Sequence, residues 1–104
     1  MSTKIKVADL PDFDMADHLQ TEDDVANYLT LVLADNDPAE LRHALGTIAR
    51  AKGMSEVALA SGLTREALYK ALRRTSQPRF DTITKVCAAL GVKLVAVPLQ
   101  SSTR

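Results

Sequence analysis

The sequence predicts a mainly α-helical domain of five helices with a short C-terminal β-strand. Apolar residues recur at helical spacing in five segments, and Gly, Pro and Asp residues separate these segments from one another. A short run near the C-terminus is instead rich in Val, as strands are. The chain has 104 residues, of which 4% are aromatic, so we expect one domain with an aliphatic core of closely packed small helices.

The N-terminal segment is predicted to be an extended acidic arm. The arm covers residues 1–20, and residues 1–14 alternate around Ile5 and Val7, which indicates a short strand over residues 4–8. Residues 15–19 are expected to form one helical turn.

Two helices follow the arm, and both have recognisable ends. Thr21 and Asp24 form a capping-box pattern at the start of a helix over residues 22–34. Asp37 is a good N-cap for the next helix, Pro38 suits its first position, and Gly53 ends it. Helical spacing predicts that these two helices bury Val25, Tyr28, Leu29, Val32, Leu33, Leu41, Leu45, Ile48 and Ala49.

Residues 55–73 are expected to form two short helices joined at Gly62. Ala58 is small enough for the second helix to cross close to the first, and Gly62 tolerates a left-handed turn conformation. Thr64 is the predicted N-cap of the second helix. The apolar face of that helix consists of Ala67, Leu68, Ala71 and Leu72.

The last helix is predicted to begin at an N-cap, Asp81, and to end at Gly91. It would bury Ile83, Val86, Cys87 and Leu90, which makes Cys87 a buried thiol rather than a reactive one. Residues 92–97 then read as an apolar strand that needs a partner, either the N-terminal segment or the same strand of a second subunit. We therefore expect one domain over residues 21–98 and a flexible tail over 99–104.

The pattern of residues 55–73 is typical of a helix-turn-helix that reads DNA. Small helical bundles without a DNA function contain similar helix pairs, but basic residues gather on and after this one. We therefore predict a DNA-binding surface that consists of Ser55, Thr64, Arg65, Glu66, Tyr69, Lys70, Arg73, Arg74 and Arg79.

The position of each residue along the second helix predicts its role. Arg65 lies at the start, where side chains reach deepest into the major groove, and is the candidate for bidentate readout of guanine. Glu66 accepts from a cytosine amine or orients Arg65. Tyr69 and Lys70 follow one turn later and reach a base edge or a phosphate. The predicted phosphate contacts are Ser55, Arg73, Arg74 and Arg79.

One motif of this kind offers little contact with DNA. We therefore expect a homodimer that reads two half-sites about 34 Å apart, with residues 92–97 as its seam.

The net charge of zero conceals two halves of opposite charge. Residues 1–37 hold two basic and nine acidic residues, a net charge of −7, whereas residues 38–104 hold eleven basic and four acidic residues, a net charge of +7. The basic part suits nucleic acid, and the acidic part suits a basic protein or serves only as a solvated face.

Other function classes find no support in the sequence. His18 and His43 are isolated, no Cys/His cluster has zinc spacing, and no Gly-rich phosphate loop occurs, so we expect no enzyme, no metal and no cofactor. Ser55, Ser61 and Cys87 have no evident base partner. No apolar run is long enough for a membrane span or a signal peptide, which favours a cytoplasmic protein.

The chain also resembles a known family, the probable addiction-module antidote proteins, which are small antitoxins with a Cro/cI-like (lambda-repressor-like) helix-turn-helix. The resemblance runs from about Asp17 to Pro98. Glu56 and the loop after Leu72 depart from the family pattern. The matching segments are residues 23–29 (DDVANYL), 37–41 (DPAEL), 44–54 (ALGTIARAKGM), 61–72 (SGLTREALYKAL) and 80–86 (FDTITKV).

The resemblance implies an antitoxin of a type II toxin–antitoxin module. Such a protein represses its own promoter and neutralises a toxin similar to the RelE/ParE fold, and residues 9–24 are the candidate toxin-binding segment. Two alternatives stay open: a stand-alone or phage-type transcriptional regulator without a toxin, and a protein-interaction module that never binds DNA. A neighbouring gene for a small basic protein would favour the antitoxin over the first, and a gel shift separates the second.

Overall fold

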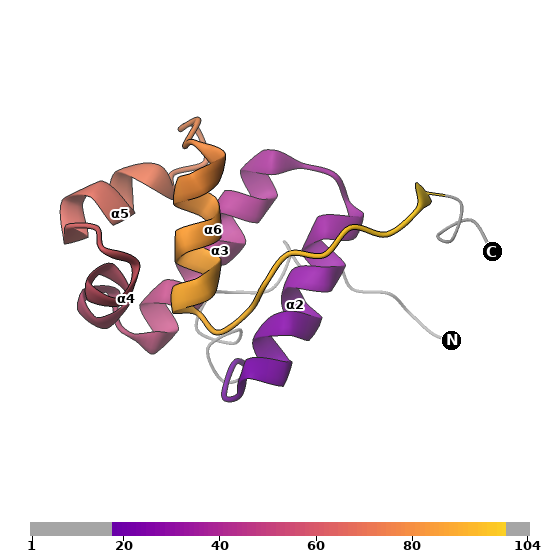
Figure 1. Cartoon of the computed structure of the whole chain (residues 1–104), viewed down its shortest axis with the longest axis horizontal. Helices are drawn as coiled ribbons and strands as arrows, with labels where there is room; N and C mark the ends of the chain where they lie inside the picture. The colour runs from indigo at the N-terminus through magenta and orange to yellow at the C-terminus, as the bar shows by residue number, and fades with distance from the viewer. Residues whose placement is uncertain (1–17, 100–104) are drawn as a thin grey trace.

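The computed structural model describes residues 18–99 and confirms the prediction of a mainly α-helical domain with five helices in this range (Figure 1). The predicted strand over residues 4–8 and most of the predicted turn over 15–19 lie outside the described residues. None of the helices within residues 18–99 is long and apolar enough to cross a membrane. The five helices are α2 (Glu22–Ala34), α3 (Pro38–Lys52), α4 (Met54–Ser61), α5 (Arg65–Ala71) and α6 (Phe80–Ala89).

The first two helices begin at the caps that the sequence predicts. In the capping box of α2, the Asp24 N–H donates to the Thr21 hydroxyl, and the Thr21 N–H donates to the Asp24 carboxylate, both at 3.0 Å. The Asp37 carboxylate accepts from the Ala39 N–H at 3.0 Å, and Pro38 is the first residue of α3. These side chains satisfy N–H groups that the first turn of a helix leaves without partners.

Gly62 makes the sharp turn between α4 and α5. Its φ of 78° lies in the left-handed region, and the Leu63 N–H donates across the turn to the Ala58 carbonyl at 2.9 Å. A Cβ placed on Gly62 would meet no heavy atom within 4 Å. The backbone conformation therefore requires glycine here, whereas the available space does not.

The core lies between the helices and is aliphatic. Helix α3 packs against α2 and α4, and α4 also packs against α5 and α6. In α2, α3 and α6 the predicted buried residues are confirmed with two exceptions: Leu33, in the last turn of α2, is 40% exposed, and Leu41 is only partly buried. Burial raises the pKa of the Cys87 thiol, because an apolar environment disfavours the thiolate. The largest fully buried side chains are Leu45, Ile48, Leu68, Leu90, Val25, Val86 and Cys87.

Of two sequence-based predictions about the C-terminal part, one is not supported by the structure and the other is wrong. Residues 92–97, predicted to be a strand, form none: no strand is found within residues 18–99, and both suggested partners, the N-terminal segment and a second subunit, lie outside the part of the chain that the structure describes. The segment instead runs across α2 (Figure 1), with Val92 and Leu94 packed against the core and Val95 and Val97 exposed.

The wrong prediction is Asp81 as the N-cap of the last helix. Its N-cap is Arg79, which is extended, and the Ile83 N–H donates to the Arg79 carbonyl at 3.2 Å. Asp81 therefore already lies within the first turn, where its own backbone is helical, so it cannot act as the cap. Its carboxylate still suits the positive end of the helix dipole.

Replacing Leu68 by Ala should lower the free energy of unfolding by about 2–5 kcal/mol, because a fully buried side chain leaves a cavity. Urea denaturation measures this loss. The matched control is Leu59→Ala in α4, where the side chain is 84% exposed and the change should stay within about 0.5 kcal/mol. Equal losses for the two variants would contradict the packing of α5 described here.

Gly62→Ala should lower the free energy of unfolding by about 1–2 kcal/mol, because Ala is strained at this φ although it has room. Gly62→Asn should lower the free energy of unfolding by less, since Asn adopts the left-handed conformation more readily than Ala does. Thermal or urea unfolding of both variants measures the difference. An Ala variant as stable as the wild type would rule out a left-handed turn at this position.

Candidate nucleic-acid interface

Helix α5 presents a polar face to solvent because its opposite face is buried. Thr64 caps the helix as predicted, its hydroxyl accepting from the Ala67 N–H at 3.0 Å. Leu68 and Leu72 point into the core, whereas Ala67 is exposed and Ala71 is half-buried, so the buried face is narrower than the sequence predicts. The exposed residues of the helix and its cap include Thr64, Arg65, Glu66, Tyr69 and Lys70.

Arg65 and Tyr69 form a pair along this face. A terminal guanidinium nitrogen of Arg65 donates to the Tyr69 hydroxyl at 3.2 Å, and its guanidinium carbon lies 5.5 Å from the centre of the Tyr69 ring. The two residues are four apart, so their side chains meet on one side of the helix. The contact holds the arginine side chain along the helix surface, and both residues are exposed.

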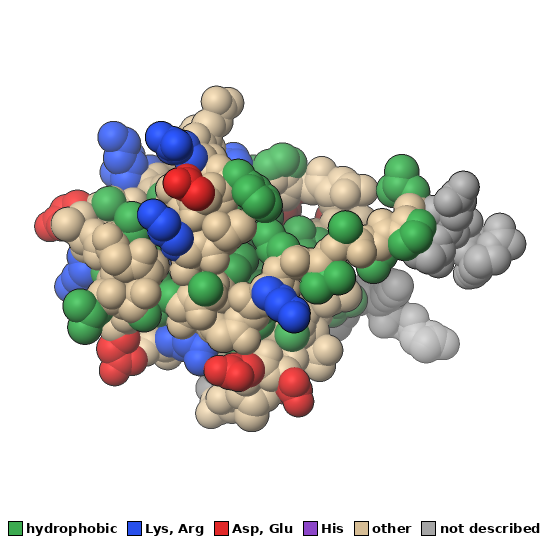
Figure 2. All heavy atoms as spheres, in the orientation of Figure 1, with side chains coloured by type: hydrophobic (Ala, Val, Ile, Leu, Met, Phe, Trp, Pro, Cys, Tyr) green, Lys and Arg blue, Asp and Glu red, His purple; other side chains and the backbone are tan. Residues whose placement is uncertain are grey.

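Two hollows flank α5, and basic side chains line both. The hollow between α5 and the start of α6 has a volume of about 480 Å³ and is lined in part by Lys70 and Arg79. The hollow between α3 and α5 has a volume of about 420 Å³ and is lined in part by Arg50, Arg73 and Arg74. Figure 2 shows Lys and Arg side chains gathered over α5, the loop after it and the start of α6.

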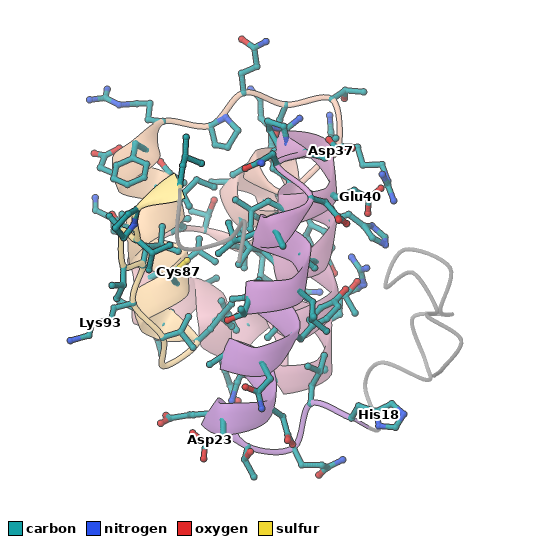
Figure 3. All side chains as sticks on the ribbon, turned by 90° about the vertical axis from the view of Figure 1, so that its right-hand side faces the viewer. His18, Asp23, Asp37, Glu40, Cys87 and Lys93 are labelled. Atoms are coloured by element: carbon teal, nitrogen blue, oxygen red, sulfur yellow. The ribbon has the colours of Figure 1, made fainter. Side chains whose placement is uncertain are left out.

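Helix α3 anchors the loop that follows α5. The Arg42 guanidinium donates to the carbonyl oxygen of Arg73 at 3.0 Å and also to the carbonyl oxygen of Arg74. A guanidinium nitrogen of Arg74 then donates to the Glu40 carboxylate at 2.7 Å. Glu40 lies close to Asp37 at one end of the molecule (Figure 3). The backbone of the loop and one of its basic side chains are thus both held by the first turns of α3.

The remaining predicted residues lie at the ends of helices. Ser55 is exposed at the second position of α4, whose N-cap, Gly53, makes no side-chain hydrogen bond. Arg79 lies 3.5 Å from the Asp81 carboxylate, and both side chains are largely exposed. The structure therefore brings eight of the nine predicted residues onto or directly beside α5, and Ser55 lies on the neighbouring helix.

Sequence reasoning missed three residues that shape this surface: Glu40, Arg42 and Arg50. All three belong to α3, and Glu40 is 34 positions away from the arginine that it holds. No local pattern reveals a contact over that separation, because it depends on how α3 packs against the later helices. Within residues 18–99, no group of three or more His, Cys, Asp or Glu side chains is placed to hold a metal ion.

Comparisons with known proteins identify the family. The model of one family, described as probable addiction module antidote protein, matches residues 9–98. The chain is also 44% identical over 84 residues to an uncharacterized protein of Haemophilus influenzae, a match that covers 81% of this chain and 87% of that protein. No solved structure gives a significant match. This chain therefore belongs to the probable addiction module antidote family, whose name implies a toxin as a partner.

Proposed function

We propose that this protein is the antitoxin of a type II toxin–antitoxin module, that it represses its own promoter by binding operator DNA, and that it neutralises a RelE/ParE-like toxin. On this proposal it acts by binding and not by catalysis, needs no cofactor, and works in the cytoplasm, where its operator lies. The observation that carries the DNA-binding part is the exposed polar face of α5 between two hollows lined by basic side chains.

The arrangement of this surface, an exposed helix with basic side chains on both flanks, suits the major groove of DNA. A recognition helix of a Cro/cI-like helix-turn-helix lies in the groove, with a phosphate backbone on either side. Lys70 and Arg79 line one flank of α5, and Arg50 and Arg73 line the other. Basic side chains in these positions face both backbones at once and provide affinity, whereas Arg65 at the start of the helix provides base readout.

A homodimer supplies the second half-site that specific binding needs. The C-terminal segment presents Val95 and Val97, each 72% exposed, and α2 presents Leu31, 59% exposed. Burying such side chains against a second copy is favourable. Analytical ultracentrifugation at micromolar concentration, alone and with the operator, tests this part of the proposal, and a monomer in both samples would contradict it.

The acidic residues at the start of α2 lie away from the DNA-binding face. Glu22, Asp23 and Asp24 occupy the first turn of α2. Figure 1 shows that end of α2 at the bottom of the molecule and α5 at the upper left, and Figure 3 places Asp23 at the end opposite Asp37. This separation supports a basic toxin that binds residues 9–24 while α5 stays available for DNA.

Co-expression with the product of the adjacent gene, followed by a pull-down, tests the antitoxin role directly. A gel shift with the protein's own upstream DNA tests the repressor role in parallel. A DNA complex without any co-purified partner would favour a stand-alone regulator. A toxin complex without DNA binding would favour a pure protein-interaction module.

Replacing Arg65 by Ala should weaken operator binding by about 1–3 kcal/mol and relax specificity at one base pair. Titrations against a set of single-base operator variants measure both effects. Lys70→Ala is the comparison, because a phosphate contact should weaken binding to every sequence about equally. A uniform loss for Arg65→Ala across all variants would contradict a base-reading role.

Removing residues 1–17 should abolish or strongly weaken toxin binding and leave operator affinity unchanged. The cut is placed there because Leu19 is buried in the core and Thr21 caps α2. Calorimetric titration with the toxin measures the first effect. A full-length variant with Asp9, Asp12, Asp14 and Asp17 changed to Asn separates charge from chain length. Toxin binding that survives the truncation would place the toxin site elsewhere.

A further inference from the structure

In the loop after α5, the side chain of Arg74 already forms an ion pair with Glu40. A guanidinium nitrogen of Arg74 lies 2.7 Å from a carboxylate oxygen of Glu40, which is the distance of a strong charge-assisted hydrogen bond. The Arg74 side chain is 47% exposed and the Glu40 side chain 22% exposed. The carboxylate is thus the more sheltered partner, and the arginine is the one that DNA can approach.

The backbone of this loop is held independently of that ion pair. Arg42 donates to the carbonyl oxygens of Arg73 and Arg74, which belong to the main chain and survive any substitution of the two side chains. The loop therefore keeps its place when Arg74 or Glu40 is changed. Only the direction and the availability of the Arg74 side chain depend on Glu40.

A carboxylate and a DNA phosphate compete for the same guanidinium. Both are anions with paired oxygens that accept the fork of N–H groups of arginine. A phosphate that takes the Arg74 nitrogen bonded to Glu40 must first displace that carboxylate, which lies on the same chain and never diffuses away. Arg74 also lines the basic hollow beside α5 together with Arg73, so it stands where a phosphate is expected.

We propose that Glu40 is a built-in competitor for phosphate, which holds Arg74 out of the set of DNA contacts and so lowers the affinity and the salt dependence of DNA binding. This inference rests on the proposed DNA-binding function and replaces the phosphate contact that the sequence predicts for Arg74. A repressor that makes one fewer phosphate contact dissociates from its promoter more readily.

The test is the salt dependence of binding for four proteins on the upstream duplex and on an unrelated duplex: wild type, Glu40→Gln, Arg74→Ala and the double variant. Fluorescence anisotropy from 50 to 200 mM salt measures the slope of log affinity against log salt. One additional phosphate contact steepens that slope by about 0.9, which corresponds to a roughly three- to fourfold greater loss of affinity over this range.

Glu40→Gln should steepen the slope by about this amount and bind more tightly at 50 mM salt. Arg74→Ala alone should leave the slope unchanged. The double variant should have the same slope as the wild type, because the arginine that Glu40→Gln releases is no longer there. The matched control is Glu56→Gln, which removes one negative charge from an exposed position on α4 and should not steepen the slope. Circular dichroism melting verifies that each variant folds.

Two results would overturn the inference while the wild type still binds DNA. One is a Glu40→Gln slope equal to that of Glu56→Gln. The other is a slope that becomes about 0.9 shallower in Arg74→Ala alone, because Arg74 would then contact phosphate in the presence of Glu40. A wild-type protein that binds neither duplex at 50 mM salt would overturn the proposed DNA-binding function as well, so the two failures are distinguishable.

Discussion

The burial of Leu68 fixes the orientation of α5, and the polar face of the candidate interface depends on it. The side chain is fully buried in the core, six residues after the left-handed turn at Gly62. With Leu68 and Leu72 inside, Arg65 and Tyr69 are both exposed, and because they are four residues apart they meet on the helix surface. The apolar core thus determines which polar groups α5 presents, although none of those groups contributes to the core.

Helix α5 is short, and its ends are held by other parts of the chain. Seven residues make few hydrogen bonds within the helix, so a helix of this length is not stable alone. Thr64 caps its start, and Arg42 of α3 holds the carbonyl oxygens of the loop after its end. The same loop carries Arg73 and Arg74, so α3 controls the position of basic groups that sequence reasoning credits to the α5 segment alone.

Most of the local stereochemistry was predictable from the sequence, Asp81 as an N-cap being an exception, whereas pairing between distant segments was not. Thr21, Asp37 and Gly62 act within a few residues of themselves, and each has the role that its type and position predict. Residues 92–97 have strand-forming composition, but a strand needs a second segment beside it, which composition does not supply. The Glu40–Arg74 pair joins residues 34 positions apart and became visible only with the packing of α3.

We propose that DNA binds to α5 and does not bind to the start of α2. Chemical-shift mapping of the ¹⁵N-labelled protein, titrated with a duplex from its own upstream region, tests this most directly. Large amide shifts are expected in residues 64–74, smaller ones at Ser55 and Arg79, and almost none in the first turn of α2. Shifts concentrated in α2, or no shifts at 50 mM salt, would contradict it.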